Sequence, residues 1–273
     1  MQLVKHKPSH IYLAARTPSK AEAAIEDIKK TIPDAPVTYL PLDLMSFDSI
    51  KKAADEFNSK STRLDILMNN AGIMATPIAF TKEGYESQFG TNHIGHALFT
   101  KLLMPTLLKT AEEPNSDVRI INLSSEGHNF SPSGGIIFET ERLKTQNPWT
   151  RYGQSKLANI LFSKGLSKRY PKITTVAVHP GVILTDLYEP AKGNWVQRAG
   201  IGLISPFFTK LEQGAWNQLW AATVEKDKLV NGGYYKPVGV LGKGSYVTGY
   251  ASNEKLADRL WDWTEEELKK HGY

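Results

Sequence analysis

The sequence contains no cysteine among its 273 residues. This absence excludes disulfide bonds, thiolate metal sites and a cysteine nucleophile, and it is compatible with a reducing compartment, so we expect a cytoplasmic protein. Long apolar runs are also missing. The opening residues Met1–Lys7 lack the apolar region of a signal peptide, and the longest candidate run, Ile201–Phe208, is broken by Pro206. We therefore expect neither a metal site nor a membrane span.

The sequence has no strong charge bias either. Its formal net charge is +5 and its isoelectric point is near 9.1, but the basic residues are spread along the chain and mostly alternate with acidic ones. This pattern favours a solvated surface over a nucleic-acid partner, which would need a basic face. With 41% apolar residues, 22% charged residues and no linker, the composition indicates one folded domain over residues 1–273.

Short apolar runs alternate with longer segments of helical periodicity. This order predicts a doubly wound α/β fold, with a mostly parallel sheet and helices on both faces. The predicted strands are His10–Ala15, Val37–Leu42, Arg63–Met68, Val118–Leu123, Ile173–Val178 and Tyr234–Val238. The predicted helices are Ser19–Ile32, Phe47–Ser59, Tyr85–Lys109, Thr150–Tyr170 and Asn253–His271. Residues 186–225, which are rich in aromatic residues and glycine, either cover a substrate pocket or complete the core.

Tyr152 and Lys156 stand four residues apart in a proline-free stretch of helix formers. This spacing places both side chains on one face of the helix. An ammonium group beside a phenol favours the phenolate form and lowers the pKa of the tyrosine from its ordinary value near ~10. Such a phenol can give a proton to a carbonyl oxygen near neutral pH, so the pair is a candidate acid/base site.

Polar or small residues follow four successive predicted strands. In an open parallel sheet, ligands bind beyond the carboxyl ends of the strands, so these residues would face one cleft. They are Asp43-Leu44, Asn69–Gly72, Ser124-Ser125 and His179–Thr185. One such ending is commonly only a turn, but four of them together with Tyr152 and Lys156 indicate a binding cleft.

The sequence resembles the short-chain dehydrogenase/reductase family from about residue 3 to the C-terminus, and it carries the family's motifs in the family's order. The resemblance is carried by Asn69–Gly72, Thr91–His96, Ile121–Ser125, Tyr152-x-x-x-Lys156 and Pro180-Gly181-x-x-x-Thr185. It implies a Rossmann-like fold. It also implies an enzyme that moves hydride between a nicotinamide cofactor and an alcohol or carbonyl group.

The resemblance implies four catalytic residues. Tyr152 matches the general acid/base, and Ser125 matches the hydroxyl that holds and polarises the substrate oxygen. Lys156 matches the cation that supports the tyrosine and binds the nicotinamide ribose, and Asn92 matches the residue that organises a water molecule between Lys156 and solvent. Two of these residues have simpler interpretations, since Ser125 could cap a turn and Asn92 could satisfy buried backbone groups.

The resemblance also implies a set of cofactor contacts. Asp43 matches the residue that meets adenine, and Asn70 and Ala71 match the wall along the adenosine. Ile183 and Thr185 match the contacts to the nicotinamide and its carboxamide. Asp43 could instead cap the helix that begins near residue 46.

The form of the cofactor depends on the residue after the first predicted strand. A site for NAD usually has an acid there, which accepts hydrogen bonds from the ribose hydroxyls. Here Arg16 stands in that place, with Lys20 one helical turn beyond, and a guanidinium suits a 2′-phosphate. We therefore predict NADP, unless Arg16 is only a solvated loop residue. Lys101, on the same predicted helix as Asn92, matches a position where the family often has a basic cofactor contact.

The sequence departs from the family at its start. The family opens with a strand, a Thr-Gly-x-x-x-Gly-x-Gly loop and a helix that together hold the pyrophosphate, whereas Met1–Lys7 resemble only the last turns of that helix. The family's sheet order places this strand between His10–Ala15 and Arg63–Met68. Either these two strands pair with each other, or an apolar groove stays open, or the natural polypeptide is longer. We expect the last.

The residues leave two functions open. The motif Ser125-Glu-Gly-His128 and the long segment before Tyr152 resemble the retinol-dehydrogenase-like branch, which implies an apolar substrate and a pocket after Thr185. The alternative is a truncated, cofactor-poor relative that acts as a binding protein or is inactive. The family also implies a possible homodimer, in which the helix of Tyr152 pairs with its symmetry mate.

Overall fold

The computed structural model describes residues 2–181, 211–242 and 249–273. Ile183 and Thr185, which were predicted to contact the nicotinamide, lie outside these ranges. The described strands form two sheets. In the smaller one, β1 (Ile11–Ala15) pairs in parallel with β2 (Val37–Pro41).

The larger sheet has five strands in the order β3-β4-β5-β6-β7. Four of them run parallel, namely β3 (Ile66–Asn69), β4 (Arg119–Leu123), β5 (Thr174–Val178) and β6 (Tyr234–Lys236). The short strand β7 (Val240–Leu241) is antiparallel to β6. The parallel strands therefore present their carboxyl ends at one edge of the sheet, as the predicted cleft requires.

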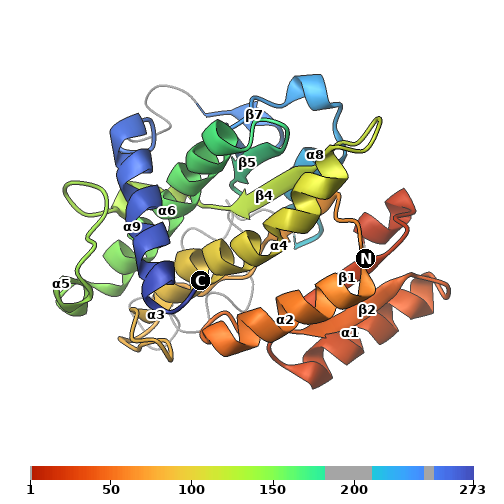
Figure 1. Ribbon diagram of the computed structural model, residues 1–273, viewed down its shortest axis with the longest axis horizontal. Helices are drawn as coiled ribbons and strands as arrows, with labels where there is room; N and C mark the ends of the chain where they lie inside the picture. The colour runs from red at the N-terminus through yellow and green to blue at the C-terminus, as the bar shows by residue number, and fades with distance from the viewer. Residues whose placement is uncertain (1, 182–210, 243–248) are drawn as a thin grey trace.

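In the described part of the chain, β1 and β3 do not pair with each other. Direct pairing, the first of the three predicted alternatives, is therefore not what the structure shows. The smaller sheet is joined to the rest by α2 (Phe47–Lys60), which packs on α4 (Gly95–Ala111) (Figure 1). The 3-10 helix η1 (Leu3–His6) adds a second link, because Leu3 packs with the larger sheet and Val4 with the smaller one.

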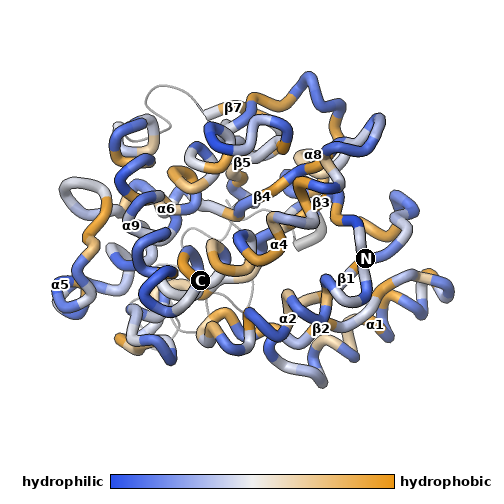
Figure 2. Tube along the Cα trace, in the orientation of Figure 1, coloured by the Kyte–Doolittle hydropathy of each residue, from blue (hydrophilic) through white to orange (hydrophobic). Residues whose placement is uncertain are grey.

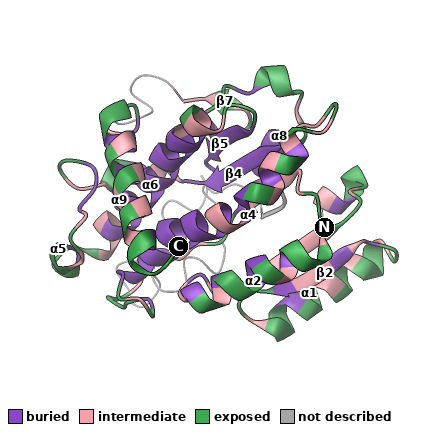
Figure 3. Ribbon diagram, viewed as in Figure 1, coloured by how far each residue is buried: buried purple, intermediate pink, exposed green. Residues whose placement is uncertain are grey.

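Helices cover both faces of each sheet, as predicted. On the smaller sheet, α1 (Pro18–Thr31) packs on one face and α2 on the other. On the larger sheet, α4 and α6 (Pro148–Arg169) cover one face, and α8 (Trp216–Thr223) covers the other. Successive strand residues alternate between these two cores, as Ile120 and Ile121 of β4 do. Figure 3 shows how burial concentrates on α4, α6 and the strands beneath them.

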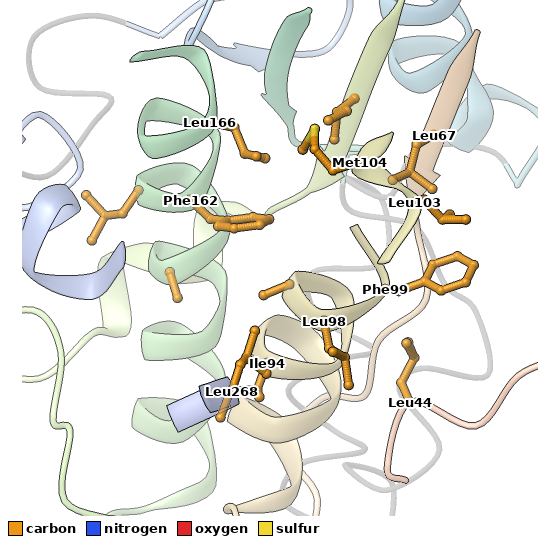
Figure 4. Close-up of a cluster of buried hydrophobic side chains, with 14 of the residues drawn as sticks. Leu44, Leu67, Ile94, Leu98, Phe99, Leu103, Met104, Phe162, Leu166 and Leu268 are labelled. Atoms are coloured by element: carbon orange, nitrogen blue, oxygen red, sulfur yellow. The ribbon is translucent and has the colours of Figure 1, made fainter. Parts of the chain in front are cut away.

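The largest apolar cluster lies between the larger sheet and helices α4 and α6 (Figure 4). Leu98 and Leu103 of α4 meet Leu67 of β3 and Phe162 and Leu166 of α6 there. All five side chains are at most 7% exposed. Burial of this size is the main stabilising contribution in a domain of this kind.

The closing helix α9 (Glu254–Lys270) packs along α6 and turns its polar side outward (Figure 2). Its Trp261 stacks on Phe162 with ring centroids 5.8 Å apart. All of residues 151–163 of α6 are buried within the chain. The predicted homodimer stays a prediction.

The predicted helix Tyr85–Lys109 is one element in sequence but three in structure. It consists of α3 (Ser87–Phe89), a π-helical turn η2 (Gly90–Ile94) and α4. π-helical turns are rare and frequently mark functional sites. The turn contains Asn92, and a Cβ on Gly95 would lie only 2.6 Å from the carbonyl oxygen of Leu44, so the helix approaches the backbone after β2 closely.

Several short elements were not predicted. They are η3 (Glu126–Phe130), α5 (Thr140–Lys144), η6 (Leu211–Ala215), α8 and η7 (Lys226–Lys228). Of the segment 186–225, the described residues 211–225 include η6 and α8, and α8 packs on β4 and β5. This part therefore completes the core, while residues 186–210 lie outside the described ranges.

In the described ranges, no helix combines the length and apolarity that a membrane span requires. No group of three His, Cys, Asp or Glu residues in the same ranges has a geometry that could hold a metal ion.

We expect the contact between α6 and α9 to contribute strongly to stability. Phe162→Ala should lower the free energy of unfolding by about 3–5 kcal/mol, because it removes a buried ring from between two helices. Urea denaturation of the purified protein measures this. Val240→Ala, at a side chain that is 56% exposed, is the control and should change stability by less than about 0.5 kcal/mol. Equal losses in the two variants would contradict the prediction.

Candidate active site

Helix α6 begins with a sequence suited to a helix start. The side chain of Asn147 accepts a hydrogen bond from the backbone N–H of Thr150 at 2.9 Å, and Pro148 occupies the first helical position. Tyr152 and Lys156 follow in the next turns, and the lysine Nζ lies 5.7 Å from the centroid of the tyrosine ring. The prediction that both side chains share one helical face is therefore confirmed.

Lys156 ties α6 to the carboxyl end of β4. Its Nζ donates to the carbonyl oxygen of Leu123 at 3.1 Å, and the hydroxyl of Ser124 donates to the carbonyl oxygen of Lys156 at 2.8 Å. Asn159, one turn further along α6, also donates to Leu123 O, at 2.8 Å. Burial lowers the pKa of Lys156 to about 8, so the amine still carries its proton at neutral pH.

Ser125 caps the 3-10 helix η3, because its Oγ accepts from the backbone N–H of Gly127 at 3.0 Å. The simpler interpretation of this serine is therefore correct, but the same contact also places it at the site. A Cβ on Gly127 would lie 2.6 Å from Cε1 of Tyr152 and 3.3 Å from Oγ of Ser125. Only glycine lets η3 approach the tyrosine ring so closely, and this approach brings the two hydroxyl-bearing side chains together.

A second glycine makes the approach possible from the other side. A Cβ on Gly153 of α6 would lie 2.6 Å from the carbonyl carbon of Phe130 and 2.8 Å from the carbonyl oxygen of Gly127. Both are backbone atoms, so a larger residue would push η3 away from α6. Neither Gly127 nor Gly153 was among the predicted site residues. Gly153 directly follows Tyr152, and Gly127 lies within the motif Ser125-Glu-Gly-His128.

Asn92 lies in the π-helical turn η2 and approaches Gly72, as Lys156 does. Its side chain accepts from the backbone N–H of Ile73 at 2.8 Å and donates to Ile73 O at 2.9 Å and to Ser155 Oγ at 2.8 Å. It therefore does satisfy backbone groups, as its simpler interpretation held. A Cβ on Gly72 would lie 3.0 Å from Asn92 Oδ1 and 3.3 Å from Lys156 Nζ, so the asparagine and the lysine flank this glycine.

The predicted adenosine contacts lie where strands end. Arg16 is exposed directly after β1 and has no hydrogen-bond or ion-pair partner among the described residues. Asn70 and Ala71 are exposed after β3. Asp43 is half-buried after β2 and accepts from the backbone N–H of Met45 at 3.0 Å.

The alternative role of Asp43 as a helix cap is wrong. The residue that caps α2 is Ser46, whose Oγ accepts from the backbone N–H of Ser49. Asp43 instead closes a turn before the helix, and its own N–H donates to Ser49 Oγ at 2.9 Å. The carboxylate thus remains at the edge of the sheet where the cleft was predicted.

Lys101 is not brought to the other predicted site residues. Its Nζ forms an ion pair with Glu265 of α9 at 2.5 Å. With Trp261 and Phe162, this pair borders a small cavity of about 120 Å³ between α4, α6 and α9. The structure thus gives Lys101 a role in the contact between α4 and α9.

Sequence reasoning also missed a buried ion pair beside Tyr152. Arg151 Nη1 lies 2.9 Å from Glu86 Oε1, and both side chains are at most 3% exposed. The carboxylate also caps α3 by accepting from the N–H of Phe89, and the guanidinium donates to Thr76 O. The pair holds the start of α6 against the start of α3. Nothing in the pattern of the sequence distinguishes these two charges from surface charges.

The fold and the site together define a class of protein. A parallel α/β sheet presents polar residues at its strand ends, and a partly buried serine, Ser125, stands beside them with the buried Tyr152 and Lys156. These features are typical of a nucleotide-dependent oxidoreductase.

Comparisons with known proteins support this class. A family model described as short chain dehydrogenase matches residues 1–194. The chain is 39% identical to the short-chain dehydrogenase/reductase drtF of Aspergillus calidoustus, over 98% of this chain and 88% of that protein. It is 35% identical to retinol dehydrogenase 12 of Mus musculus, over 93% of this chain and 77% of that protein.

Solved structures agree in fold. An uncharacterised protein from Mycobacterium paratuberculosis is 30% identical, with a TM-score of 0.70 over 94% of this chain and 83% of that one. The carbonyl reductase from chicken fatty liver is 22% identical, with a TM-score of 0.60 over 87% of this chain and 88% of that one. The chain belongs to the short-chain dehydrogenase/reductase family. It is thus an oxidoreductase of the kind that acts on CH–OH groups and carbonyls.

The close approach of η3 to α6 gives a test of the site. Gly127→Ala should lower kcat by about a hundredfold, because the new methyl group displaces the Tyr152 ring or the Ser125 loop by about 1 Å. It should lower stability by only about 1–3 kcal/mol. Steady-state kinetics and thermal unfolding measure the two effects.

Gly249→Ala is the matched control, because a Cβ there would meet nothing within 4 Å. It should leave both quantities unchanged. A Gly127→Ala variant with normal kcat would show that the contact between η3 and Tyr152 is not needed for activity.

Proposed function

We propose that the protein is an NADP-dependent oxidoreductase that interconverts an apolar alcohol and its carbonyl compound, with Tyr152 as general acid/base. One observation carries the proposal. Tyr152 is buried with the Lys156 amine 5.7 Å from its ring centroid, while the Ser125 hydroxyl stands beside the same ring. The bound cofactor supplies or takes the hydride. The side chains of the chain bind the substrate oxygen and move its proton.

Ser125 is prepared to donate to the substrate oxygen. Its Oγ already accepts a hydrogen bond from Gly127 N, so its own proton is available to the carbonyl or alcohol oxygen. Tyr152 then gives a proton to that oxygen in reduction and takes it back in oxidation. The ammonium group of Lys156 favours the phenolate that forms in reduction. Asn92, across Gly72 from this amine, organises the path by which the proton is replaced.

The described residues fit a dinucleotide at both of its ends. Among these residues the Lys156 amine has one acceptor, Leu123 O, which leaves two N–H groups for the hydroxyls of the nicotinamide ribose. Arg16, Asp43 and Asn70 stand at the ends of three strands for the adenosine half. Arg16 has no partner in the described part of the chain, and its planar guanidinium matches a 2′-phosphate, which favours NADP over NAD.

The proposal of an apolar substrate is based on the relatives of this chain. Retinol dehydrogenase 12 of Mus musculus, named for an apolar alcohol, is similar to 93% of this chain. The motif Ser125-Glu-Gly-His128 supports the same branch of the family. We therefore propose apolar aldehydes such as hexanal or retinal as the first substrates to test.

The role of Tyr152 is tested by Tyr152→Phe. This variant removes the proton that the carbonyl oxygen needs and should lower kcat by at least about a hundredfold, while the fold and the binding of NADPH stay intact. NADPH oxidation with hexanal or retinal measures activity, and circular dichroism verifies the fold. Turnover at the rate of the unchanged protein would remove Tyr152 from the mechanism.

The preference for NADP is tested by Arg16→Ala. Loss of a charge-assisted contact to the 2′-phosphate should weaken NADPH binding by about tenfold or more and leave NADH binding nearly unchanged. Titration of the purified protein with each nucleotide, followed by fluorescence, measures both constants. Lys20→Ala, one helical turn beyond Arg16, is the neighbouring comparison and should have the smaller effect. If the unchanged protein binds neither nucleotide, the alternative of a cofactor-poor binding protein is favoured instead.

A further inference from the structure

Three buried polar atoms close to Tyr152 have no hydrogen-bond partner in the described part of the chain. They are Nε2 of His128, Nδ1 of His179 and the hydroxyl oxygen of Tyr234. The three residues are 0%, 4% and 4% exposed. Buried polar groups in folded proteins are nearly always hydrogen-bonded, to protein or to an ordered water molecule. Three such atoms in one place therefore indicate something bound among them.

The three side chains come from neighbouring elements, and the backbone N–H of His179 donates to the carbonyl oxygen of Tyr235, next to Tyr234, at 2.8 Å. His128 lies in η3, His179 directly follows β5, and Tyr234 begins β6. The rings of His128 and Tyr234 meet nearly at right angles, with centroids 5.2 Å apart. Burial lowers the pKa of His179 to about 4. Both histidines are therefore uncharged at neutral pH, since burial also lowers the pKa of His128.

This group adjoins the proposed catalytic residues. Gly127, next to His128 in η3, contacts the ring of Tyr152. Burial raises the pKa of Tyr234, and the charges of Glu126 and Tyr152 contribute in the same direction, so this phenol keeps its proton. Glu126 pairs with Lys236 at 2.5 Å. This ion pair is partly exposed and marks the solvent side of the group.

The hydrogen-bonding roles of the three atoms can be assigned. His128 Nδ1 lies 2.7 Å from the carbonyl oxygen of Ser125, and a carbonyl oxygen can only accept, so Nδ1 carries the proton. Nε2 of this neutral ring is then an acceptor. The Tyr234 hydroxyl is a donor, and Nδ1 of His179 is a second acceptor when its ring proton is on Nε2. Two acceptors and one donor complement the two donors and the oxygen of a water molecule.

We propose that His128, His179 and Tyr234 bind one internal water molecule, and that this water holds η3, and with it Ser125, in place beside Tyr152. The water accepts from the tyrosine hydroxyl and donates to both imidazoles, which gives it three hydrogen bonds, the usual number for buried water. Since His128 also donates to Ser125 O, the water links β5 and β6 to the loop that carries the serine. The three side chains are positioning residues, because they act on the reaction through Ser125. The consequence for catalysis rests on the proposed function.

Two variants each remove one partner of this water. Tyr234→Phe deletes only the hydroxyl. His128→Asn keeps a donor near the position of Nδ1, for the bond to Ser125 O, and deletes Nε2. Each single variant should lower the melting temperature by about 2–4 °C. With NADPH and hexanal or retinal, each should lower kcat by about tenfold. This loss is smaller than the loss of about a hundredfold that a 1 Å misplacement of a catalytic group causes.

The double variant decides the question. If both side chains bind the same water, its loss is complete after the first substitution, so the double variant should match the more affected single variant in kcat and in melting temperature. Tyr235→Phe is the control on the same strand. Its hydroxyl accepts from the backbone N–H of Val230 at 2.6 Å, on the opposite face of the sheet, so this variant should lower the melting temperature and leave kcat unchanged.

Independent losses, with the two effects multiplying in kcat and adding in melting temperature, would overturn the proposal. So would a high-resolution crystal structure in which the three atoms have no water between them or contact the substrate instead. Thermal unfolding requires no substrate, so it tests the water even in a protein without turnover. A wild-type protein that shows the expected coupling in melting temperature but no oxidoreductase activity would contradict only the proposed function.

Discussion

The attachment of α6 to the carboxyl end of β4 is the contact on which the rest of the site depends. Lys156 and Asn159 both donate to the carbonyl oxygen of Leu123, and Ser124 donates back to α6. These bonds lie in a buried region, where an unmade hydrogen bond is costly. They set the distance between the helix that carries Tyr152 and strand β4, which Ser125 follows. Ser125, Tyr152 and Lys156 take their positions from this pair of elements.

Buried polar side chains then extend this attachment outward. Asn69 donates to Asn122 at 2.8 Å, and Asn122 donates to Ser163 of α6 at 2.9 Å, so β3, β4 and α6 are joined beneath the site. The ion pair between Glu86 and Arg151 joins α6 to α3 on the far side. Buried hydrogen bonds and ion pairs of this kind favour one arrangement of the elements over others. The unpartnered atoms of His128, His179 and Tyr234 motivate the proposed water.

The two sheets present different residues of the proposed site. The smaller sheet presents Arg16 and Asp43, which are proposed to bind the adenosine half of a dinucleotide, while the larger one presents Ser125 and packs against the helix of Tyr152. Packing of α2 on α4 connects them, and Gly95 of α4 comes within contact of the backbone at Leu44. Cofactor binding would therefore bridge two units that the protein core already holds together.

The sequence by itself determined the α/β class, most strands and helices to within a few residues, and the shared face of Tyr152 and Lys156. These follow from hydrophobic period and from helical geometry, which are local. Its motifs also determined the family. Tertiary structure alone decided that Lys101 pairs with Glu265, that Arg151 is buried against Glu86, and that Gly127 and Gly153 admit η3 to the tyrosine ring. Each of these depends on which residues distant in the chain come into contact, and burial changes the energy of a charge or a methyl group in ways that local sequence does not record.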